Sequence, residues 1–243
     1  MNLPNVITIG RIAMTPLVAL LPFADSWGLR LLAFVLFIVA AVSDYYDGML
    51  ARTRNLVTPL GQLLDPFADK LLLVGTLVPM FLLAGGGWSA WGAPAAAVAE
   101  PIPLGPVADP SGDARFPFVT ALGRVGLPWW VLAVVLGREL FMTVFRQMAA
   151  RRGVIIAAIG PAKWKTGFQS TWVGAAYFWF FAATLAAEQG WSAAPWTAFA
   201  HFNGLVGVVT MLAATLLTVW SLWLYVRDYG HVLWGGAGAR PRA

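Results

Sequence analysis

Long apolar runs constrain the fold of this chain more than any other feature of its sequence. They include Leu31–Val42, Leu71–Ala84, Trp129–Leu136 and Leu205–Val219. A helix needs about 20 predominantly apolar residues to cross the hydrocarbon core of a bilayer. Hydrophobic residues make up 59% of the chain and charged residues only 11%, which is about half the charged share of a typical soluble domain. The sequence therefore predicts an all-α, polytopic membrane protein.

Six transmembrane helices are expected, because turn-forming residues separate six segments of suitable length. The expected spans are residues 5–24, 29–53, 61–84, 127–150, 165–187 and 203–226. An even number of spans places both termini on one side of the membrane. Residues 85–126, rich in Gly, Ala and Pro, are expected to form an external loop insert. We treat residues 1–243 as a single membrane domain.

Basic residues are distributed unequally between the two sides of the expected bundle. The loops on the side of the termini hold Arg52, Arg54, Arg151, Arg152, Lys163, Arg227, Arg240 and Arg242. The opposite side holds only Arg30, Arg115 and Arg124. Because Lys and Arg are enriched in cytoplasmic loops, we expect the termini to be cytoplasmic. The net charge of +5 is then explained by the enrichment of basic residues on the cytoplasmic side and by contact with anionic membrane lipids, and it does not indicate a nucleic acid partner.

Four aspartates lie between two apolar spans, in the stretch DYYDGMLARTRNLVTPLGQLLDPFADK. Asp44 and Asp47 are three residues apart, and Asp65 and Asp69 are four apart, so each pair shares one face of its helix. A short turn joins the two helices, which makes them antiparallel neighbours. We therefore expect the four carboxylates to converge across one helix interface on the cytoplasmic side.

Four close carboxylates need cations between them to stay ionised. Oxygen ligands suit Mg²⁺, Mn²⁺ or Ca²⁺ better than zinc, and a pair of such ions is a usual solution for phosphoryl chemistry. One alternative is that the aspartates are interfacial or paired with nearby basic residues, which suits a single aspartate better than four at helical spacing. A cation transporter is a second alternative, although the adjacent Arg52 and Arg54 oppose a cation path there.

The same stretch resembles the CDP-alcohol phosphatidyltransferase family, whose motif is D-x2-D-G-x2-A-R-x8-G-x3-D-x3-D. The eight fixed positions are all present at the required spacing: Asp44, Asp47, Gly48, Ala51, Arg52, Gly61, Asp65 and Asp69. The resemblance implies an enzyme with six spans, commonly a homodimer. Such an enzyme moves a phosphatidyl group from CDP-diacylglycerol to an alcohol and releases CMP.

The resemblance also implies a role for each motif residue. Two Mg²⁺ or Mn²⁺ ions would be bound by Asp44, Asp47, Asp65 and Asp69. Asp69 would in addition be the general base that takes the proton from the acceptor hydroxyl. The CDP-diacylglycerol site would be lined by Gly48, Ala51, Arg52 and Gly61.

Further segments, one of which overlaps the end of the motif, resemble one branch of the family, the bacterial phosphatidylglycerophosphate synthases. These segments are NLPNVITIGRIAMTPL with Asn5 and Arg11, LLDPFADKLLL, GRELFMTVFRQMAARRG and AIGPAKWKTGFQ. This resemblance implies sn-glycerol 3-phosphate as the acceptor and the bacterial inner (cytoplasmic) membrane as the location. Arg11 either belongs to the site or anchors the first helix at the interface.

A group of basic residues agrees with an anionic acceptor. An arginine within a span is costly unless it meets an anion, and a guanidinium suits phosphate. The acceptor phosphate is therefore expected to be bound by Arg138, Arg146, Lys163 and Lys165. Alternatively, Arg138 forms a structural ion pair with Glu139, and the other three are topology signals. The acceptors phosphatidylglycerol, inositol phosphate and serine also remain open.

Overall fold

The computed structural model describes residues 3–53, 58–83, 118–121, 123–156, 160–191 and 193–230. Within these residues the structure is dominated by long helices, followed here in chain order: α1 (Leu3–Leu20), α2 (Trp27–Thr53), α3 (Pro59–Leu83), α5 (Trp129–Arg151), α6 (Gly160–Gln189) and α7 (Ala194–Tyr229). A 3₁₀ turn, η1 (Leu21–Phe23), follows α1. Two short antiparallel strands, β1 (Phe118–Thr120) and β2 (Gly123–Val125), precede α5.

Four of the described helices contain a segment long and apolar enough to cross a membrane: Pro4–Phe23, Trp27–Asp44, Pro59–Leu83 and Ala194–Tyr229. The prediction of an all-α membrane protein is therefore confirmed. Helices α5 and α6 have 23 and 30 residues, which is also sufficient length. Their charged side chains, among them Glu139 and Lys165, lower their mean hydropathy. Their assignment as spans stays a prediction.

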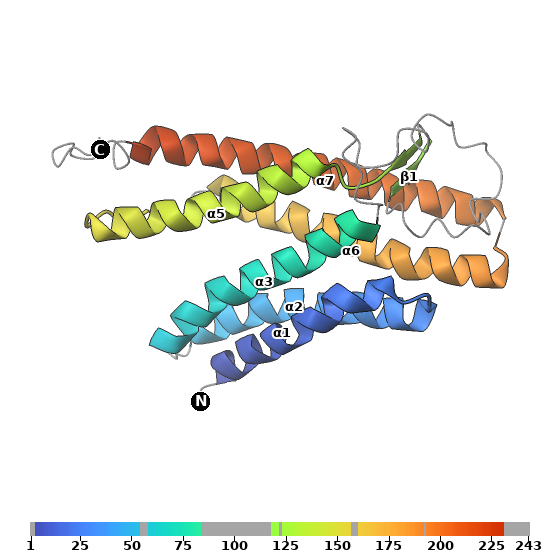
Figure 1. Cartoon of the computed structure of the whole chain (residues 1–243), viewed down its shortest axis with the longest axis horizontal. Helices are drawn as coiled ribbons and strands as arrows, with labels where there is room; N and C mark the ends of the chain where they lie inside the picture. The colour runs from blue at the N-terminus through green and yellow to red at the C-terminus, as the bar shows by residue number, and fades with distance from the viewer. Residues whose placement is uncertain are drawn as a thin grey trace.

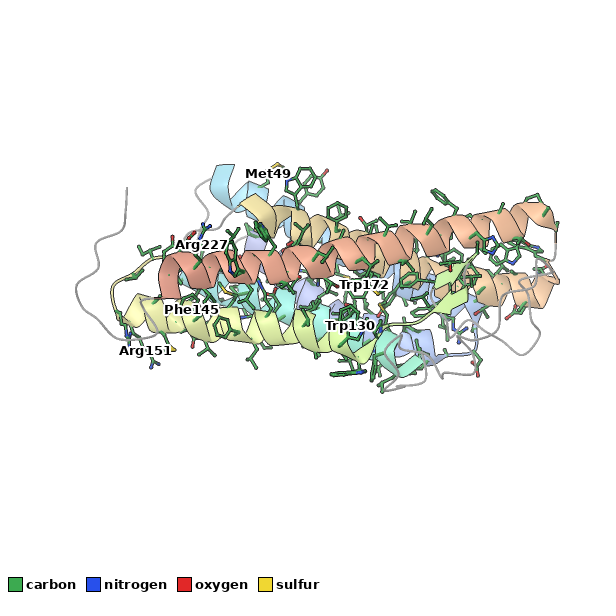
Figure 2. The ribbon with its side chains drawn as sticks, turned by 90° about the horizontal axis from the view of Figure 1, so that it is seen from above. Met49, Trp130, Phe145, Arg151, Trp172 and Arg227 are labelled. Atoms are coloured by element: carbon green, nitrogen blue, oxygen red, sulfur yellow. The ribbon has the colours of Figure 1, made fainter. Side chains whose placement is uncertain are left out.

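The helices form an elongated bundle in which successive helices run in opposite directions (Figure 1). Helix α1 packs against α2 and α3, α2 packs against α6, and α6 and α5 both pack against α7. The start of α1 and the ends of α5 and α7 lie at the same end of the bundle. Arg151 and Arg227 are also found there, as Figure 2 shows. This basic end is the one near which the aspartates lie.

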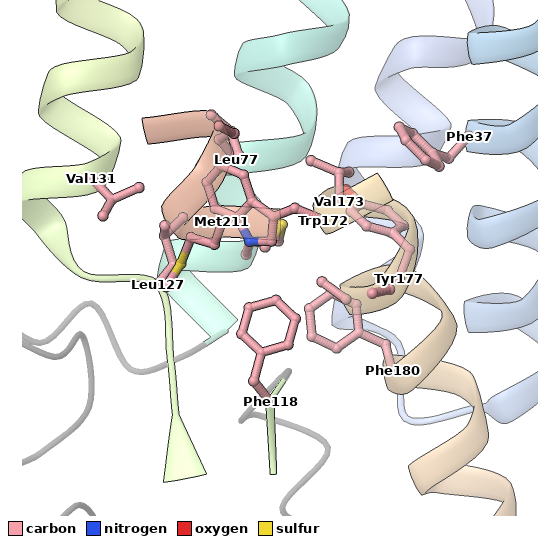
Figure 3. Close-up of a cluster of buried hydrophobic side chains, with 14 of the residues drawn as sticks. Phe37, Leu77, Phe118, Leu127, Val131, Trp172, Val173, Tyr177, Phe180 and Met211 are labelled. Carbon is pink, nitrogen blue, oxygen red and sulfur yellow. The ribbon is translucent and has the colours of Figure 1, made fainter. Parts of the chain in front are cut away.

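The buried hydroxyl of Tyr177 compensates for two prolines in the core. Pro22 and Pro79 have no backbone N–H, so the carbonyls four residues earlier, on Val18 and Gly75, lose their usual helical partners. The Tyr177 Oη lies 3.2 Å from the carbonyl oxygen of Val18 and 3.4 Å from that of Gly75. One fully buried side chain on α6 thereby connects α1 with α3 at the centre of the bundle (Figure 3).

Replacing Tyr177 with Phe is expected to lower the stability of the bundle by about 1–3 kcal/mol, because buried carbonyls then lose their donor. The phenylalanine ring keeps the stacking on Phe37, at a centroid distance of 5.6 Å, so the hydroxyl alone is removed. The measurement is thermal unfolding in detergent. The matched control is Tyr229→Phe at the end of α7, which should leave the melting temperature unchanged. Equal melting temperatures for wild type and Tyr177→Phe would contradict this assignment.

The described end of the 85–126 insert packs against the bundle. Phe118 is fully buried and belongs to the largest apolar cluster, where it lies near Phe180 (Figure 3). Glycines on α7 permit this approach, since a Cβ on Gly204 would overlap the backbone of Val119 and one on Gly207 would overlap the Phe118 ring. The expectation of an external loop stays a prediction for residues 85–117, which lie outside the described residues.

Candidate active site

Three of the four motif aspartates have described side chains. Asp44 lies in the C-terminal half of α2, and Asp65 and Asp69 lie one turn apart in the first half of α3. The fourth, Asp47, belongs to α2, but its side chain lies outside the described residues, as do those of Gly48, Ala51 and Arg52. Helices α2 and α3 each pack against α1, which therefore connects the described aspartates. Direct convergence of the four carboxylates across an interface between α2 and α3 stays a prediction.

The side chain of Arg11 joins two of these carboxylates. Its Nη1 donates to Oδ1 of Asp44 and, at 3.1 Å, to Oδ1 of Asp69. The Arg11 side chain is 1% exposed, whereas those of Asp44 and Asp69 are 45% and 56% exposed. The arginine therefore approaches from inside the bundle, and the carboxylates remain accessible from the opposite side. Of the two roles considered for Arg11, the structure places it in the site.

A threonine on the same face of α1 holds the third carboxylate. The hydroxyl of Thr8 donates to Oδ1 of Asp65 at 2.9 Å, and it also lies 3.1 Å from the carbonyl of Pro4. Thr8 and Arg11 are three residues apart, so they share a helix face directed at α2 and α3. Thr8 was not singled out from the sequence. The three-residue spacing of Thr8 and Arg11 was visible in the sequence, but nothing in the sequence alone showed which helix faces the aspartates.

A cavity of about 190 Å³ opens beside the aspartates. Helices α1, α2, α3, α5 and α6 all contribute to its wall. Its charged lining residues are Arg11, Asp44, Asp69, Lys70, Glu139 and Lys165. Three carboxylates and three cations thus line one cavity. Such a lining suits a ligand whose anionic groups can pair with the cations of the cavity.

The predicted acceptor-binding residues take different positions around this cavity. Lys165 lines it and donates its Nζ to Oε1 of Glu139. Arg138 is 7% exposed and reaches the cavity wall only through Glu139, to whose Oε1 its Nη1 donates at 2.8 Å. Arg146 contacts the hydroxyl of Tyr225 at 3.5 Å, farther along α5. The Lys163 side chain lies outside the described residues.

Glu139 is the functional candidate that the sequence prediction did not select. It was considered only as an ion-pair partner of Arg138. The structure places Glu139 on the cavity wall, in contact with two cations. It was missed because the rotation of α5, which the sequence does not give, decides whether Arg138 or Glu139 faces the cavity.

Gly61 lies where α1 approaches the start of α3. A Cβ on Gly61 would come within 2.8 Å of Oδ1 of Asn5 and 3.2 Å of Oγ1 of Thr58. The Thr58 hydroxyl donates to Asn5 at 3.0 Å and accepts from the Gly61 N–H at 3.0 Å. The absence of a side chain at Gly61 is therefore explained by close packing at the start of α3.

The donor chemistry of the site fits a hard divalent cation. Carboxylate oxygens, contributed here by α2 and α3, are the ligands that Mg²⁺ and Mn²⁺ prefer. Among the side chains that the structure describes, no group of three or more acidic, histidine or cysteine residues is arranged as a ready metal site. Arg11 instead contacts Asp44 and Asp69, so its guanidinium supplies positive charge between them.

Comparison with known proteins agrees with the chemistry of the cavity. The family model for CDP-alcohol phosphatidyltransferase matches residues 1–100 and 103–234. A CDP-diacylglycerol–glycerol-3-phosphate 3-phosphatidyltransferase 1, chloroplastic/mitochondrial, of Arabidopsis thaliana is 30% identical over 96% of this chain, which spans 64% of that protein. A probable phosphatidylglycerophosphate synthase of Mycobacterium tuberculosis is 30% identical, with 95% of this chain and 85% of that protein covered. A Rickettsia bellii CDP-diacylglycerol–glycerol-3-phosphate 3-phosphatidyltransferase is 48% identical over 33% of this chain and 44% of its own length.

Proposed function

Because this chain belongs to the CDP-alcohol phosphatidyltransferase family, we propose that it transfers a phosphatidyl group from CDP-diacylglycerol to sn-glycerol 3-phosphate and releases CMP. The names of the relatives support this acceptor. The observation that carries the proposal is a single cavity that has Asp44 and Asp69 on one wall and Lys165 on another. Acidic residues that activate a hydroxyl and a cation that binds a phosphate thus face the same space.

The reaction requires one bond to form and one to break at the same phosphorus atom. The acceptor hydroxyl oxygen attacks the phosphorus that carries diacylglycerol, and the bond from this phosphorus to the oxygen bridging to CMP breaks. The hydroxyl proton passes to the Asp69 carboxylate, which is 56% exposed toward the cavity side. CMP leaves with the bridging oxygen and its electron pair. Asp69 is therefore assigned as the general base.

Two divalent ions, Mg²⁺ or Mn²⁺, complete this proposal. Their ligands would be the four motif aspartates, Asp44, Asp47, Asp65 and Asp69. The chemistry that such ions supply is neutralisation of the pyrophosphate oxygens and of the departing CMP. From α1, Arg11 contacts the carboxylates of Asp44 and Asp69, and Thr8 contacts that of Asp65.

The remaining motif residues are proposed to bind the nucleotide lipid. Gly48, Ala51 and Arg52 follow Asp47 on α2, and Gly61 lies near the start of α3. For Gly61 the described packing against Asn5 supports an indirect contribution, in which close helix approach shapes this end of the site.

The phosphate of the acceptor is proposed to bind the basic group on α5 and α6. Lys165 has direct access to the cavity, which supports its assignment most strongly. Arg138 stands behind Glu139, and Arg146 lies two turns beyond Arg138 on α5, so both would act at longer range. Lys163 is included because it precedes Lys165 by two residues on α6.

We further propose that all six long helices span the membrane and that the chain forms one domain over residues 1–243. The active site and both termini would face the cytoplasm, because the basic end of the bundle satisfies the positive-inside rule. The membrane would be the bacterial inner membrane, in contact with anionic lipids, and the protein would assemble as a homodimer.

An acceptor screen with the purified full chain tests this proposal. CMP release from CDP-diacylglycerol in detergent micelles would be measured with sn-glycerol 3-phosphate, phosphatidylglycerol, inositol phosphate or serine. We expect kcat/KM for sn-glycerol 3-phosphate to exceed the values for the other acceptors by about tenfold or more. A site built for this acceptor would be left with unpaired polar groups when another acceptor binds. Chelation of divalent ions should abolish the release.

Two other outcomes would overturn different parts of the proposal. Faster reaction with another acceptor would retain the chemistry and refute the acceptor. No CMP release with any acceptor, accompanied by cation flux in proteoliposomes, would refute the enzyme and favour a transporter.

A further inference from the structure

Glu139 stands out as a carboxylate in a place where its charge opposes binding. It lines the cavity proposed to take two anionic substrates, and Asp44 and Asp69 already supply negative charge there. Like charges in a site of reduced dielectric repel substrate phosphates. A partly buried carboxylate in this position needs a compensating role, and its contacts indicate one.

Both cations nearest to Glu139 donate to the same oxygen atom. Its Oε1 accepts from the Lys165 ammonium and, at 2.8 Å, from Nη1 of Arg138. The Lys165 and Arg138 side chains are 8% and 6% exposed, and that of Glu139 is 23% exposed. Because the two cations share one acceptor, the position of Glu139 fixes where the Lys165 ammonium lies on the cavity wall.

The other end of this ion-pair chain is attached to α7. Nη2 of Arg138 lies 3.3 Å from Oγ of Ser221, and its guanidinium lies 5.9 Å from the ring centroid of Tyr225. Ser221 and Tyr225 are fully buried, and the Ser221 hydroxyl donates to the Thr218 carbonyl at 3.0 Å. Arg138 is thereby fixed against buried residues of α7. Because Glu139 accepts from both Arg138 and Lys165, it links Lys165 on α6 to this fixed arginine.

We propose that Glu139 is a positioning residue, which holds the Lys165 ammonium in place for the phosphate of the acceptor. A lysine is a point charge on a flexible stem of four carbons, so it binds a phosphate well only when its ammonium is restrained. An ammonium has three N–H donors, and the bond to Glu139 uses one, which leaves donors for the cavity. This inference rests on the proposed function, because it assumes a phosphate-bearing acceptor.

The test is the variant Glu139→Gln, which keeps the side-chain shape and removes the charge that restrains both cations. Without that charge Arg138 and Lys165 repel each other, and the more flexible Lys165 turns away from the cavity. We expect KM for sn-glycerol 3-phosphate to rise about tenfold, because the bound phosphate does not react and contributes equally to ground and transition states. The KM for CDP-diacylglycerol should not change.

Two further variants make the test specific. Glu139→Asp keeps the charge on a shorter side chain, so its KM should lie between those of wild type and Glu139→Gln. Glu188→Gln is the matched control, since this exposed residue lies on α6 about 35 Å along the helix from Lys165. It should reproduce the wild-type kinetics. If Glu139→Gln cannot be purified in a folded state, the KM of Glu139→Asp decides alone: a value above that of wild type supports the positioning role, and the wild-type value contradicts it.

The outcomes separate this inference from the proposed function. A lower KM in Glu139→Gln would show that the carboxylate only repels the acceptor, and an unchanged KM with a lower melting temperature would show a purely structural role. Either result overturns the positioning role while wild-type activity stands. Absence of wild-type CMP release with every acceptor overturns both.

Discussion

Replacing Asp69 with Asn is expected to lower kcat for phosphatidyl transfer about a thousandfold, because a general base typically contributes 10² to 10⁴-fold. Asparagine has nearly the same shape, and its carbonyl oxygen can still accept the hydrogen bond that Asp69 receives from Arg11 at 3.1 Å. The variant therefore removes proton acceptance with little change in packing. Steady-state CMP release gives kcat, and a binding assay with CDP-diacylglycerol should show that most nucleotide-lipid affinity is retained.

A matched acidic residue distinguishes this effect from a general loss of charge. Asp25 is fully exposed between η1 and α2, away from the cavity, and its contact with Arg30 is 3.4 Å. Asp25→Asn should keep wild-type kcat. If Asp69→Asn retained a tenth or more of wild-type kcat, another group would have to accept the hydroxyl proton, and Asp69 would be at most a metal ligand.

The sequence predicted the helices well because apolar composition and turn residues both act locally. The expected span 29–53 corresponds to α2 (Trp27–Thr53), and 127–150 to α5 (Trp129–Arg151). The largest difference is α7, which begins at Ala194 although its span was expected from residue 203. Pro195 lies at a position where proline is compatible with a helix start, so the helix extends beyond the apolar segment.

Contacts between distant helices could not be predicted in the same way. The sequence assigned Arg138 and Arg146 to the acceptor phosphate, but it gave no rotation of α5 relative to α6. The structure supplies this rotation and places Glu139 on the cavity wall with Arg138 behind it. The Tyr177 hydroxyl is a similar case, because its two carbonyl partners come from α1 and α3.

Arg11 shows most clearly what the sequence could and could not tell. The resemblance of the N-terminal segment made Arg11 a candidate for the site, with an anchor at the membrane interface as the alternative. Its partners were undetermined, because 33 residues separate Arg11 from Asp44 and 58 separate it from Asp69. Once the helices are packed, the same guanidinium nitrogen serves both carboxylates. Arg11 is then the cation that directly contacts both Asp44 and Asp69.

Arg11→Met is therefore expected to destabilise the metal-free protein and to increase its response to divalent ions. Methionine fills the apolar part of the 1% exposed Arg11 site, but Asp44 and Asp69 then repel each other. Breaking a buried ion pair costs about 3–5 kcal/mol, and exposure of both carboxylates should reduce the cost to about half. Because a ligand that binds only the folded state stabilises it, Mg²⁺ or Mn²⁺ should restore more stability in the variant than in wild type.

The measurement is the melting temperature in detergent, with chelator and then with millimolar Mg²⁺ or Mn²⁺, for both proteins. Transfer activity with metal present should still fall about a hundredfold, since a preorganised donor in an active site typically contributes that much. Arg227→Met is the control, because Arg227 pairs with Asp228 on the surface and exposed pairs contribute little. An equal metal-induced shift in Arg11→Met and wild type would mean that the ions do not bind at Asp44 and Asp69. A larger shift in the variant would instead place Arg11 and the divalent ions in competition for the same two carboxylates, and it would do so independently of any assay of catalysis.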